Sequence, residues 1–315
     1  MTIEQAQRAI KHGAVFVDRS NLGMLKLTGK TRVDLIHRMS TQDLRGMQSG
    51  EGRATVLTTD IGRIIDRLII YTSTDTAYVL TSENVGDPIA RYLMRYVFFN
   101  DDFHLQDLSS QTAIFGVYGA KSADLLAAVG FPETDLPLHH WREARIDDMT
   151  AYLHSTDAIA GGGYFVMCNV DHQTQLAEML TAAGMVAIDE AAFDYVRIEA
   201  GLPRFGHELT EDFIPLETGL WADVSFAKGC YIGQEIIARM DSRGKLAKKM
   251  VRFSAESPLQ TGDIVSNGKK VGTLTSAANS ASGSVGLGYV RTRALDSAEV
   301  QLMSGNSQLH IQPPR

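Results

Sequence analysis

Residues 228–235 read KGCYIGQE, and this is the most unusual stretch of the 315-residue chain. A glycine on each side of the cysteine allows backbone conformations that other residues resist. Lys228 lies two positions before Cys230, and positive charge near a thiol favours the thiolate that attacks electrophiles or binds metal. Free cysteine is also commonly a small buried hydrophobe, so these residues alone leave both roles open. The other cysteine, Cys168, lies in the run FVMCNV, which is typical of a buried strand, and we expect it in the core.

The motif opens a basic window in an acidic protein. The chain has 30 Lys and Arg against 37 Asp and Glu, whereas residues 228–252 hold seven basic side chains and two acidic ones. A basic segment of this kind can attract an anionic ligand. Broad nucleic-acid binding needs a basic face, so the net charge of −7 makes nucleic acid an unexpected partner.

Upstream of the motif, strand and helix patterns alternate. Short apolar runs between turn residues predict strands at 22–28, 54–59, 63–71, 76–82, 103–108, 112–118 and 161–170. Apolar stripes at helical spacing predict helices at 30–40, 87–97, 122–129, 171–183 and 190–200. This order predicts an α+β fold with helices on one face of mainly antiparallel sheets. Residues 202–228 show no periodicity, and long irregular stretches in compact proteins are more often functional than idle.

The pattern changes near residue 245. Short β runs then alternate with turns and no helix pattern remains; Asn267-Gly268 is a tight hairpin turn. Closely spaced hairpins predict a small β-barrel or sandwich over 246–315, which leaves 1–245 as a separate region.

The N-terminal stretch and the cysteine count limit the class of protein. Residues 1–17 are polar and lack the apolar stretch and cleavage site of a signal peptide, and no apolar run approaches the ~20 residues that span a bilayer. We therefore expect a cytoplasmic protein without direct membrane contact. Two cysteines exclude a disulfide framework and a metal site built from cysteines alone.

KGCYIGQE resembles the signature of the YgfZ-type folate-binding proteins, relatives of the glycine-cleavage T-protein, an aminomethyltransferase. Further matches are RIEAG at 197–201, RFG at 204–206, IP at 214–215, GRIID at 62–66 and GLGYV at 286–290. The resemblance implies a three-part cloverleaf around a central hole that holds a reduced folate. Residues 1–245 would form two interleaved α+β subdomains, and 246–315 the C-terminal β-barrel.

The resemblance also implies a folate site. In T-proteins a Glu of the R-x-E segment holds the pterin, and the matching residue is Glu199. A carboxylate that accepts two N–H groups recognises such a ring in a fixed orientation. The implied cofactor is tetrahydrofolate or a derivative, and its anionic tail could meet Arg239, Arg243 or Lys245. Tyr231 and Trp221 could stack on the ring, although a core role is common for aromatics. The cofactor-binding candidates are Glu199, Arg197, Lys228, Tyr231, Gln234 and Arg239.

Three departures separate this chain from T-proteins. Asp66 is followed by Arg67 where T-proteins carry two acids, Gln234 replaces a usually basic residue, and Cys230 is not a T-protein feature. They indicate the YgfZ-type branch, which is implicated in maintaining or assembling iron–sulfur clusters in client enzymes, including a radical enzyme that modifies tRNA. The catalytic candidates are Cys230 and Asp66.

Three functions follow as hypotheses. The first is a folate-binding accessory protein that serves iron–sulfur enzymes or assembly proteins through Cys230, without turnover of its own. The alternative is a folate-dependent aminomethyl or one-carbon transferase that acts through Asp66, since an acid beside the reactive nitrogens of folate would steer the transfer. The third is a cysteine hydrolase or acyltransferase with His207 as base, for which the sequence offers no orienting third group.

Overall fold

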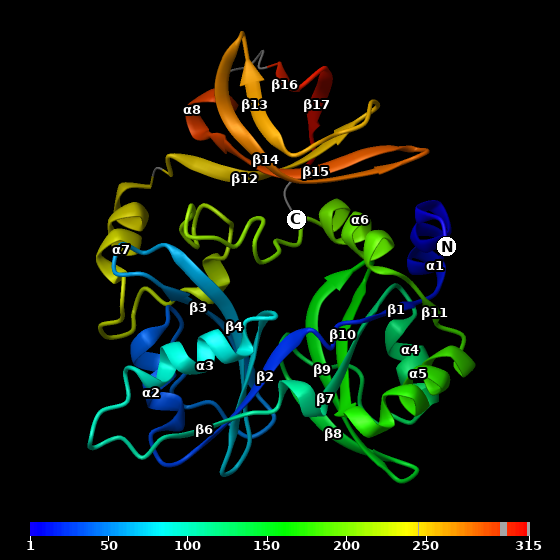
Figure 1. Cartoon of the computed structure of the whole chain (residues 1–315), viewed down its shortest axis with the longest axis vertical. Helices are drawn as coiled ribbons and strands as arrows, with labels where there is room; N and C mark the ends of the chain where they lie inside the picture. The colour runs from blue at the N-terminus through cyan, green and yellow to red at the C-terminus, as the bar shows by residue number, and fades with distance from the viewer. Residues whose placement is uncertain (245, 297–300, 314–315) are drawn as a thin grey trace.

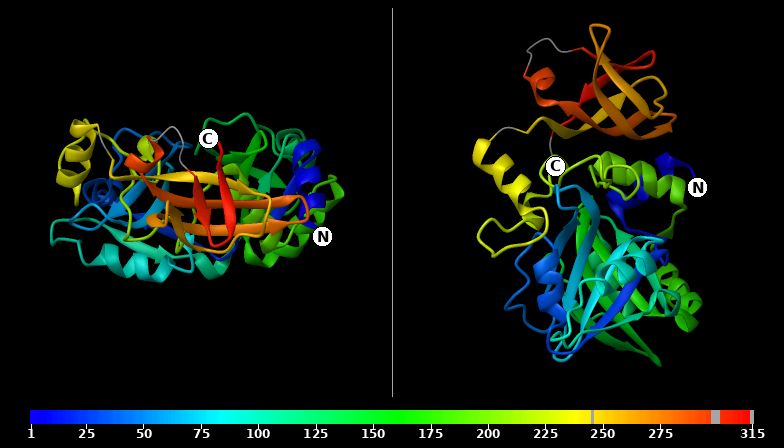
Figure 2. Two further views of the ribbon diagram at one scale, coloured as in Figure 1. Left: turned by 90° about the horizontal axis from the view of Figure 1, so that it is seen from above. Right: turned by 60° about the vertical axis from the view of Figure 1, so that its left-hand side comes forward.

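The computed structural model describes residues 1–244, 246–296 and 301–313 and divides into three parts (Figure 1). Two sheets with their helices lie side by side, and a closed barrel lies above them. The barrel sits on helix α6 (Glu190–Ala200) and on the irregular segment that follows this helix (Figure 2). The predicted α+β class is confirmed, and the C-terminal hairpins form a barrel rather than a sandwich.

The first sheet is antiparallel throughout and is drawn in blue and cyan in Figure 1. Its strand order is β3 (Gly52–Thr58), β4 (Ile64–Thr72), β5 (Ala77–Glu83), β2 (Leu22–Thr28) and β6 (His104–Asp107). Helices α2 (Arg32–Met39) and α3 (Gly86–Met94) cover one face and bury leucines from both layers. Helix α3 ends three residues before the predicted stripe does, but Val97 still packs on the same core from the turn.

The second sheet is antiparallel except for one short parallel pair, β1 with β11. Its strand order is β11 (Val186–Ala187), β1 (Val15–Asp18), β7 (Thr112–Tyr118), β10 (Gly162–Asn169), β9 (Met149–Ile159) and β8 (Trp141–Ile146). Helices α4 (Ser122–Val129) and α5 (Gln173–Ala182) pack on one face. Strands β8 and β9 were not predicted because charged and polar residues interrupt their apolar positions.

The two sheets interleave along the chain. Strand β1 belongs to the second sheet, the next five strands build the first sheet, and β7 returns to the second. Their inner faces meet in one apolar cluster, to which Tyr71 and Leu80 contribute from the first sheet and Trp141 and Phe165 from the second. This contact fixes the relative position of the strand ends that form the site.

Helix α6 is the central support of the molecule. The Asp189 side chain accepts a hydrogen bond from Ala192 N at 2.9 Å, and Gly201 ends the helix with a φ of 78°, so both predicted ends are confirmed. Helix α1 (Ile3–His12) packs beside α6, and strands of the barrel pack above it. Residues 202–233 hold only one turn of 3₁₀ helix, Trp221–Asp223, as the lack of periodicity predicts.

A helix that the sequence did not predict follows the motif, α7 (Gln234–Arg243). The barrel strands then follow in the closed order β12 (Lys248–Ala255), β15 (Gly283–Arg291), β14 (Lys269–Ser280), β13 (Gly262–Ser266), β16 (Leu302–Ser304) and β17 (Ser307–Ile311). A short helix, α8 (Thr292–Leu295), follows β15. The β13–β14 turn has positive φ at Asn267 and Gly268, as its sequence predicts. Within the described ranges, no helix combines the length and apolarity that a bilayer crossing requires.

Candidate functional site

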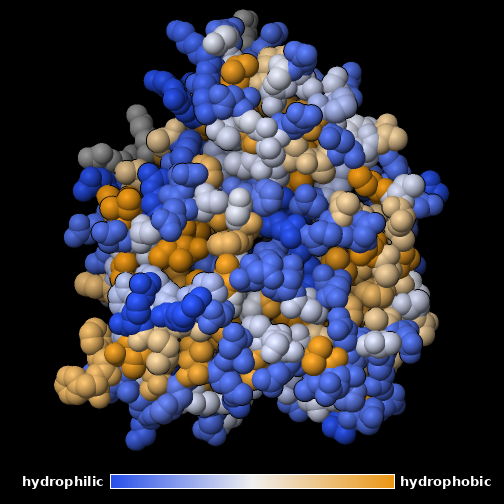
Figure 3. All heavy atoms as spheres, viewed as in Figure 1, coloured by the Kyte–Doolittle hydropathy of each residue, from blue (hydrophilic) through white to orange (hydrophobic). Residues whose placement is uncertain are grey.

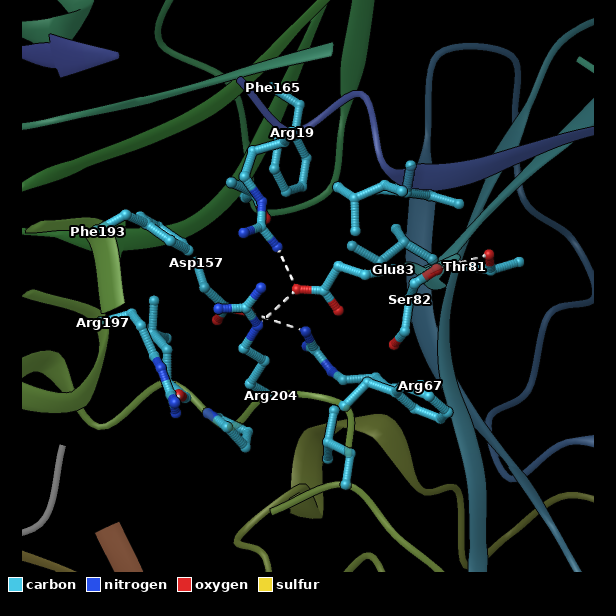
Figure 4. A pocket seen from close by; sticks show the side chains of 18 of the residues that line it. Arg19, Arg67, Thr81, Ser82, Glu83, Asp157, Phe165, Phe193, Arg197 and Arg204 are labelled. Carbon is cyan, nitrogen blue, oxygen red and sulfur yellow. Dashed lines mark hydrogen bonds and ion pairs between the residues drawn. The ribbon is translucent and has the colours of Figure 1, made fainter. Parts of the chain in front are cut away.

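A cavity of about 130 Å³ lies where the two sheets, α6 and residues 202–209 meet. Its wall is unusually basic, and hydrophilic side chains surround the same central point on the molecular surface (Figure 3). The charged and aromatic side chains of the wall are Arg19, Arg67, Arg197, Arg204, Glu83, Asp157, Tyr118, Phe165, Phe193 and Phe205 (Figure 4). They come from both sheets, from α6 and from the irregular segment, so no single stretch of sequence holds the site.

Glu83, the last residue of β5, lies between two arginines of the wall. It accepts hydrogen bonds from Arg19 Nη2 at 2.5 Å and from Arg204 Nε at 2.9 Å (Figure 4). Burial raises the pKa of Glu83, but the charges of Arg19 and Arg204 outweigh it and hold the pKa below its usual value. Arg204 also forms an ion pair with Glu190 of α6. These pairs cross the cavity and narrow it.

Arg19 has a buried donor without an acceptor. Its Nη1 has no hydrogen-bond partner among the described residues, and the Glu190 carboxylate lies 3.7 Å from it, beyond hydrogen-bond distance. The guanidinium lies 4.6 Å from the ring centre of Phe193. A buried N–H without an acceptor is costly, so this donor fits a ligand that offers an oxygen or ring nitrogen.

Arg67 joins three separate segments. Its Nε donates to Asp223 at 2.6 Å, and its Nη1 donates to Asp157 of β9 at 3.0 Å. Burial lowers the pKa of Arg67, and the two carboxylates more than reverse this, so the pKa lies above its ordinary value. The basic residue at this position therefore holds β4 to β9 and to the irregular segment.

Asp66 lies behind the wall and not in it. Neighbouring residues of a strand point to opposite faces, and Arg67 is the one that faces the cavity. Asp66 is fully buried and accepts hydrogen bonds from Arg67 N at 2.9 Å and Ser82 N at 3.1 Å. Burial raises its pKa to about 6. Asp66 is therefore not part of the cavity wall, and its catalytic role stays a prediction.

Arg197 and Glu199 lie on different sides of α6. Arg197 is 2% exposed, lines the cavity, and donates to Glu208 at 2.9 Å and Ser276 at 2.8 Å. Residues two apart on a helix do not share a face. Glu199 is exposed and accepts a hydrogen bond from Gln7 Nε2 at 2.9 Å. The Glu199 carboxylate is therefore not part of the cavity wall, and its role in holding a ligand stays a prediction.

Lys228 anchors the motif loop to the end of α2. Its Nζ donates to the carbonyl oxygens of His37, Ser40 and Gln42 at 2.5, 2.7 and 2.9 Å. These carbonyls lie at and just beyond the C-terminal end of α2, where a cation is favoured. Burial lowers the pKa of Lys228 to about 8. The three carbonyl groups hold the ammonium group, and with it the start of the motif loop, against the end of α2.

The other motif residues also have local partners. Gln234 begins α7, and its Oε1 accepts a hydrogen bond from Tyr231 N at 3.2 Å. Tyr231 is half-buried against an apolar cluster that includes Leu216 and Ile237, and burial raises its pKa to about 12. Neither residue lines the cavity, nor does the exposed Arg239 on α7.

Arg243, Lys245 and Trp221 are the other candidates for binding the folate tail or stacking on the ring. Lys245 and the side chain of Arg243 lie outside the described residues. Trp221 is 44% exposed and is not part of the cavity wall. The rings that line the cavity are those of Tyr118, Phe165, Phe193 and Phe205.

Cys230 is an exposed free thiol on the anchored loop. Cys230 does not line the central cavity, whereas a thiol beside the folate site would lie at the rim of that cavity. His207, the suggested base, has its Nδ1 3.2 Å from the carbonyl oxygen of Thr275 in the barrel. None of the hydrogen bonds described for the chain joins Cys230 to a histidine, which removes the support for a Cys–His hydrolase. The described residues also contain no cluster of three potential metal ligands.

Comparison with known families assigns this architecture. The GCVT N-terminal domain model matches residues 1–228, and the model of the CAF17 C-terminal beta-barrel domain matches residues 248–315. The chain belongs to the YgfZ/CAF17 family. This family lies within the aminomethyltransferase superfamily, as KGCYIGQE predicts.

Individual relatives agree with the family assignment. The chain is 28% identical over 295 residues to "Putative transferase At1g60990, chloroplastic" of Arabidopsis thaliana, covering 92% of this chain and 68% of the relative. It is 24% identical to the aminomethyltransferase of Bacillus subtilis, covering 89% and 79%. The glycine cleavage system aminomethyltransferase T of Bartonella henselae has the same fold, with a TM-score of 0.84 at 19% identity over 98% of this chain and 87% of that one. The predicted cloverleaf with its small barrel is therefore confirmed.

Sequence reasoning missed most of the wall. Arg19 follows β1, and Glu83, Asp157 and Phe193 lie in β5, β9 and α6, so none of the four belongs to a shared motif. Arg204 was part of a matched stretch but received no role. The sequence offered one signal for these residues. Arg67 stands where T-proteins carry an acid, and a positive charge that is buried there requires acidic side chains nearby.

Proposed function

We propose that this chain binds a reduced folate, tetrahydrofolate or a derivative, in the central cavity. The observation that carries the proposal is the buried Arg19 Nη1 without an acceptor, beside the Phe193 ring. A pterin is flat and carries both a carbonyl acceptor and N–H donors. Arg19 would donate to the acceptor, Glu83 would accept from the donors, and the aromatic residues of the wall would contact the ring.

The cavity must widen to admit this ligand. Its 130 Å³ is below the ~300–1,000 Å³ of typical ligand pockets, and the Glu83 ion pairs cross it. Glu83 would exchange Arg204 for the pterin N–H groups. Arg204 keeps Glu190 as its partner in this exchange, so no buried charge is left alone.

Calorimetric titration with tetrahydrofolate tests the site. Glu83→Gln should weaken binding at least tenfold, because the acceptor charge is lost, whereas Glu199→Gln should change affinity less than twofold. The opposite order would place the pterin at Glu199 and overturn the cavity assignment. Absence of binding to the folded wild-type protein would reject the folate proposal, with circular dichroism as the check on folding.

We further propose that Cys230 serves iron–sulfur client enzymes or their assembly proteins, with the folate site as a separate requirement. The exposed thiol on a loop held by Lys228 supports contact with another protein, and the match to the CAF17-type barrel supports the family role. In a deletion strain, Cys230→Ser should fail to restore the activity of an iron–sulfur enzyme, including a radical tRNA-modifying enzyme, while Cys168→Ala restores it. Full restoration by Cys230→Ser would reject this role.

The alternative is a folate-dependent aminomethyl or one-carbon transferase. The fold shared with an aminomethyltransferase supports it, and the near-neutral pKa of Asp66 suits a proton acceptor. Turnover with a methylamine or formaldehyde donor that is lost in Asp66→Asn would establish it. No turnover with any donor would leave the accessory role. A cytoplasmic location stays a proposal, and one relative is named chloroplastic.

A further inference from the structure

A second cavity, of about 260 Å³, lies between the inner faces of the two sheets. It shares no lining residue with the central cavity. The two cavities nevertheless use the same strands. On β2, Leu22 lines the central cavity and Met24 lines the second. On β9, Thr156 lines the central cavity and His154 lines the second. Since residues two apart on a strand share a face, the cavities occupy successive positions along one interface.

Aromatic rings form the wall of the second cavity. The planes of Trp141 and His154 are nearly parallel, at 14° and 5.7 Å between ring centres. Tyr152 is tilted against Trp141 at 6.0 Å, and Tyr78 meets Trp141 edge-on at 6.5 Å. Trp141 Nε1 already donates to Thr72 O at 3.0 Å, so its N–H has its acceptor within the protein. Such a wall favours a flat ring.

The charge of the wall narrows the choice of ligand. No Asp, Glu, Lys or Arg belongs to it, and His154 is 4% exposed and uncharged at neutral pH because burial lowers its pKa to about 3. His154 Nδ1 has no hydrogen-bond partner among the described residues. A charged ligand would be buried without a counterion, and a hydrocarbon chain would leave the imidazole unsatisfied. Gln111 and Asn169, both exposed, supply polar groups at the mouth.

We propose that this second cavity binds a flat, uncharged heteroaromatic ring that stacks on the Trp141 side of the wall and hydrogen-bonds to His154. Its volume, just under the ~300–1,000 Å³ of typical pockets, suits one ring system whose substituents leave past Gln111 and Asn169. This site is separate from the folate site in residues, charge and expected ligand.

Trp141 is itself the reporter for the test. The chain has two tryptophans, and the other, Trp221, is exposed, so Trp221→Phe leaves a single fluorophore in the cavity wall. Adenine is the probe, as a neutral flat heteroaromatic at neutral pH. We expect a saturable change in Trp141 fluorescence and a rise in the thermal midpoint on adding adenine, because a ligand that binds only the native state stabilises it.

Two further variants in the Trp221→Phe background locate the binding. Thr150→Phe fills the cavity from its half-buried edge and should weaken adenine binding at least tenfold, whereas Thr181→Phe on the exposed side of α5 should leave it unchanged. His154→Leu, if folded, should weaken it by a similar factor. Glu83→Gln should not affect adenine, which separates this site from the folate proposal.

Three results would overturn the proposal. A fluorescence signal that does not saturate with adenine would show that no site exists. A saturable signal that survives Thr150→Phe would place adenine elsewhere. If tetramethylammonium binds and adenine does not, the cavity is a cation cage. If decanoate binds and adenine does not, the cavity is a pocket for a lipid chain.

Discussion

The central cavity and the motif loop are built in opposite ways. The cavity wall joins distant segments through buried ion pairs, such as Arg67 with Asp157 and Arg197 with Glu208. The loop holds its shape through short-range contacts and through two long-range hydrogen-bond donors, Lys228 and Thr58, and leaves Cys230 exposed. Removing one partner of a buried pair leaves an uncompensated charge, whereas exposed side chains change stability little. Damage in the wall should therefore affect the whole fold, and damage in the loop should stay local.

The largest effect is expected at Arg197. Arg197→Ala leaves the fully buried Glu208 without a countercharge, and we expect a loss of about 3–5 kcal/mol in the free energy of unfolding by urea denaturation. Glu199→Ala on the same helix is the control and should cost at most about 0.5 kcal/mol, since that side chain is exposed. A loss below about 1 kcal/mol for Arg197→Ala would remove the contrast between the two regions.

Asp66 gives the cavity region a pH dependence. Its pKa is about 6 in the folded chain and 3.8 as the ordinary value, so the folded state binds more protons between these values. The resulting stability is fully present below about pH 4 and is lost as the pH rises through 6, by up to about 3 kcal/mol. Relative to Asp66→Asn, the wild type should gain this amount when denaturation is measured at pH 4 instead of pH 7. Parallel pH profiles for the two proteins would contradict the buried placement.

Lys228 tests whether the loop is locally anchored. Lys228→Met removes a charged donor from three carbonyl groups, which should cost about 2–3 kcal/mol. Hydrogen exchange should rise mainly in residues 225–233 and at the end of α2, with the cavity strands unchanged. Lys249→Met, at an exposed position, is the matched control. Faster exchange throughout both sheets would show that the loop and the cavity form one cooperative unit.

The smallest effect is expected at Cys230. Cys230→Ser should change stability by at most about 0.5 kcal/mol because the thiol is exposed. A disulfide reagent should find one fast thiol in the native wild type and none in this variant, since Cys168 is buried and its pKa is raised to about 11. A fast thiol that persists in Cys230→Ser would mean that the strand around Cys168 opens readily.

Local sequence signals predicted the elements whose ends are set locally. Asp189 and Gly201 bound α6, and Asn267-Gly268 forms the hairpin of the barrel, because caps and tight turns depend on residues next to each other. Strands β8 and β9 were missed because charged and polar residues interrupt their apolar pattern. Only in the folded sheet are these residues paired or exposed to solvent. Helix α7 was missed because polar and charged residues make up most of it and it begins directly after a glycine.

The amino-acid sequence alone determined the family, the α+β cloverleaf with its barrel and the unusual position of Cys230, because these depend on short motifs and local periodicity. Tertiary structure decided which side chains meet. It turned Arg67 and Arg197 toward the cavity and Asp66 and Glu199 away from it, and it brought Arg19 and Glu83 together across 64 positions. The physical reason is geometric: strand and helix periodicity assigns each residue a face, but only the packing of the three parts determines what that face meets.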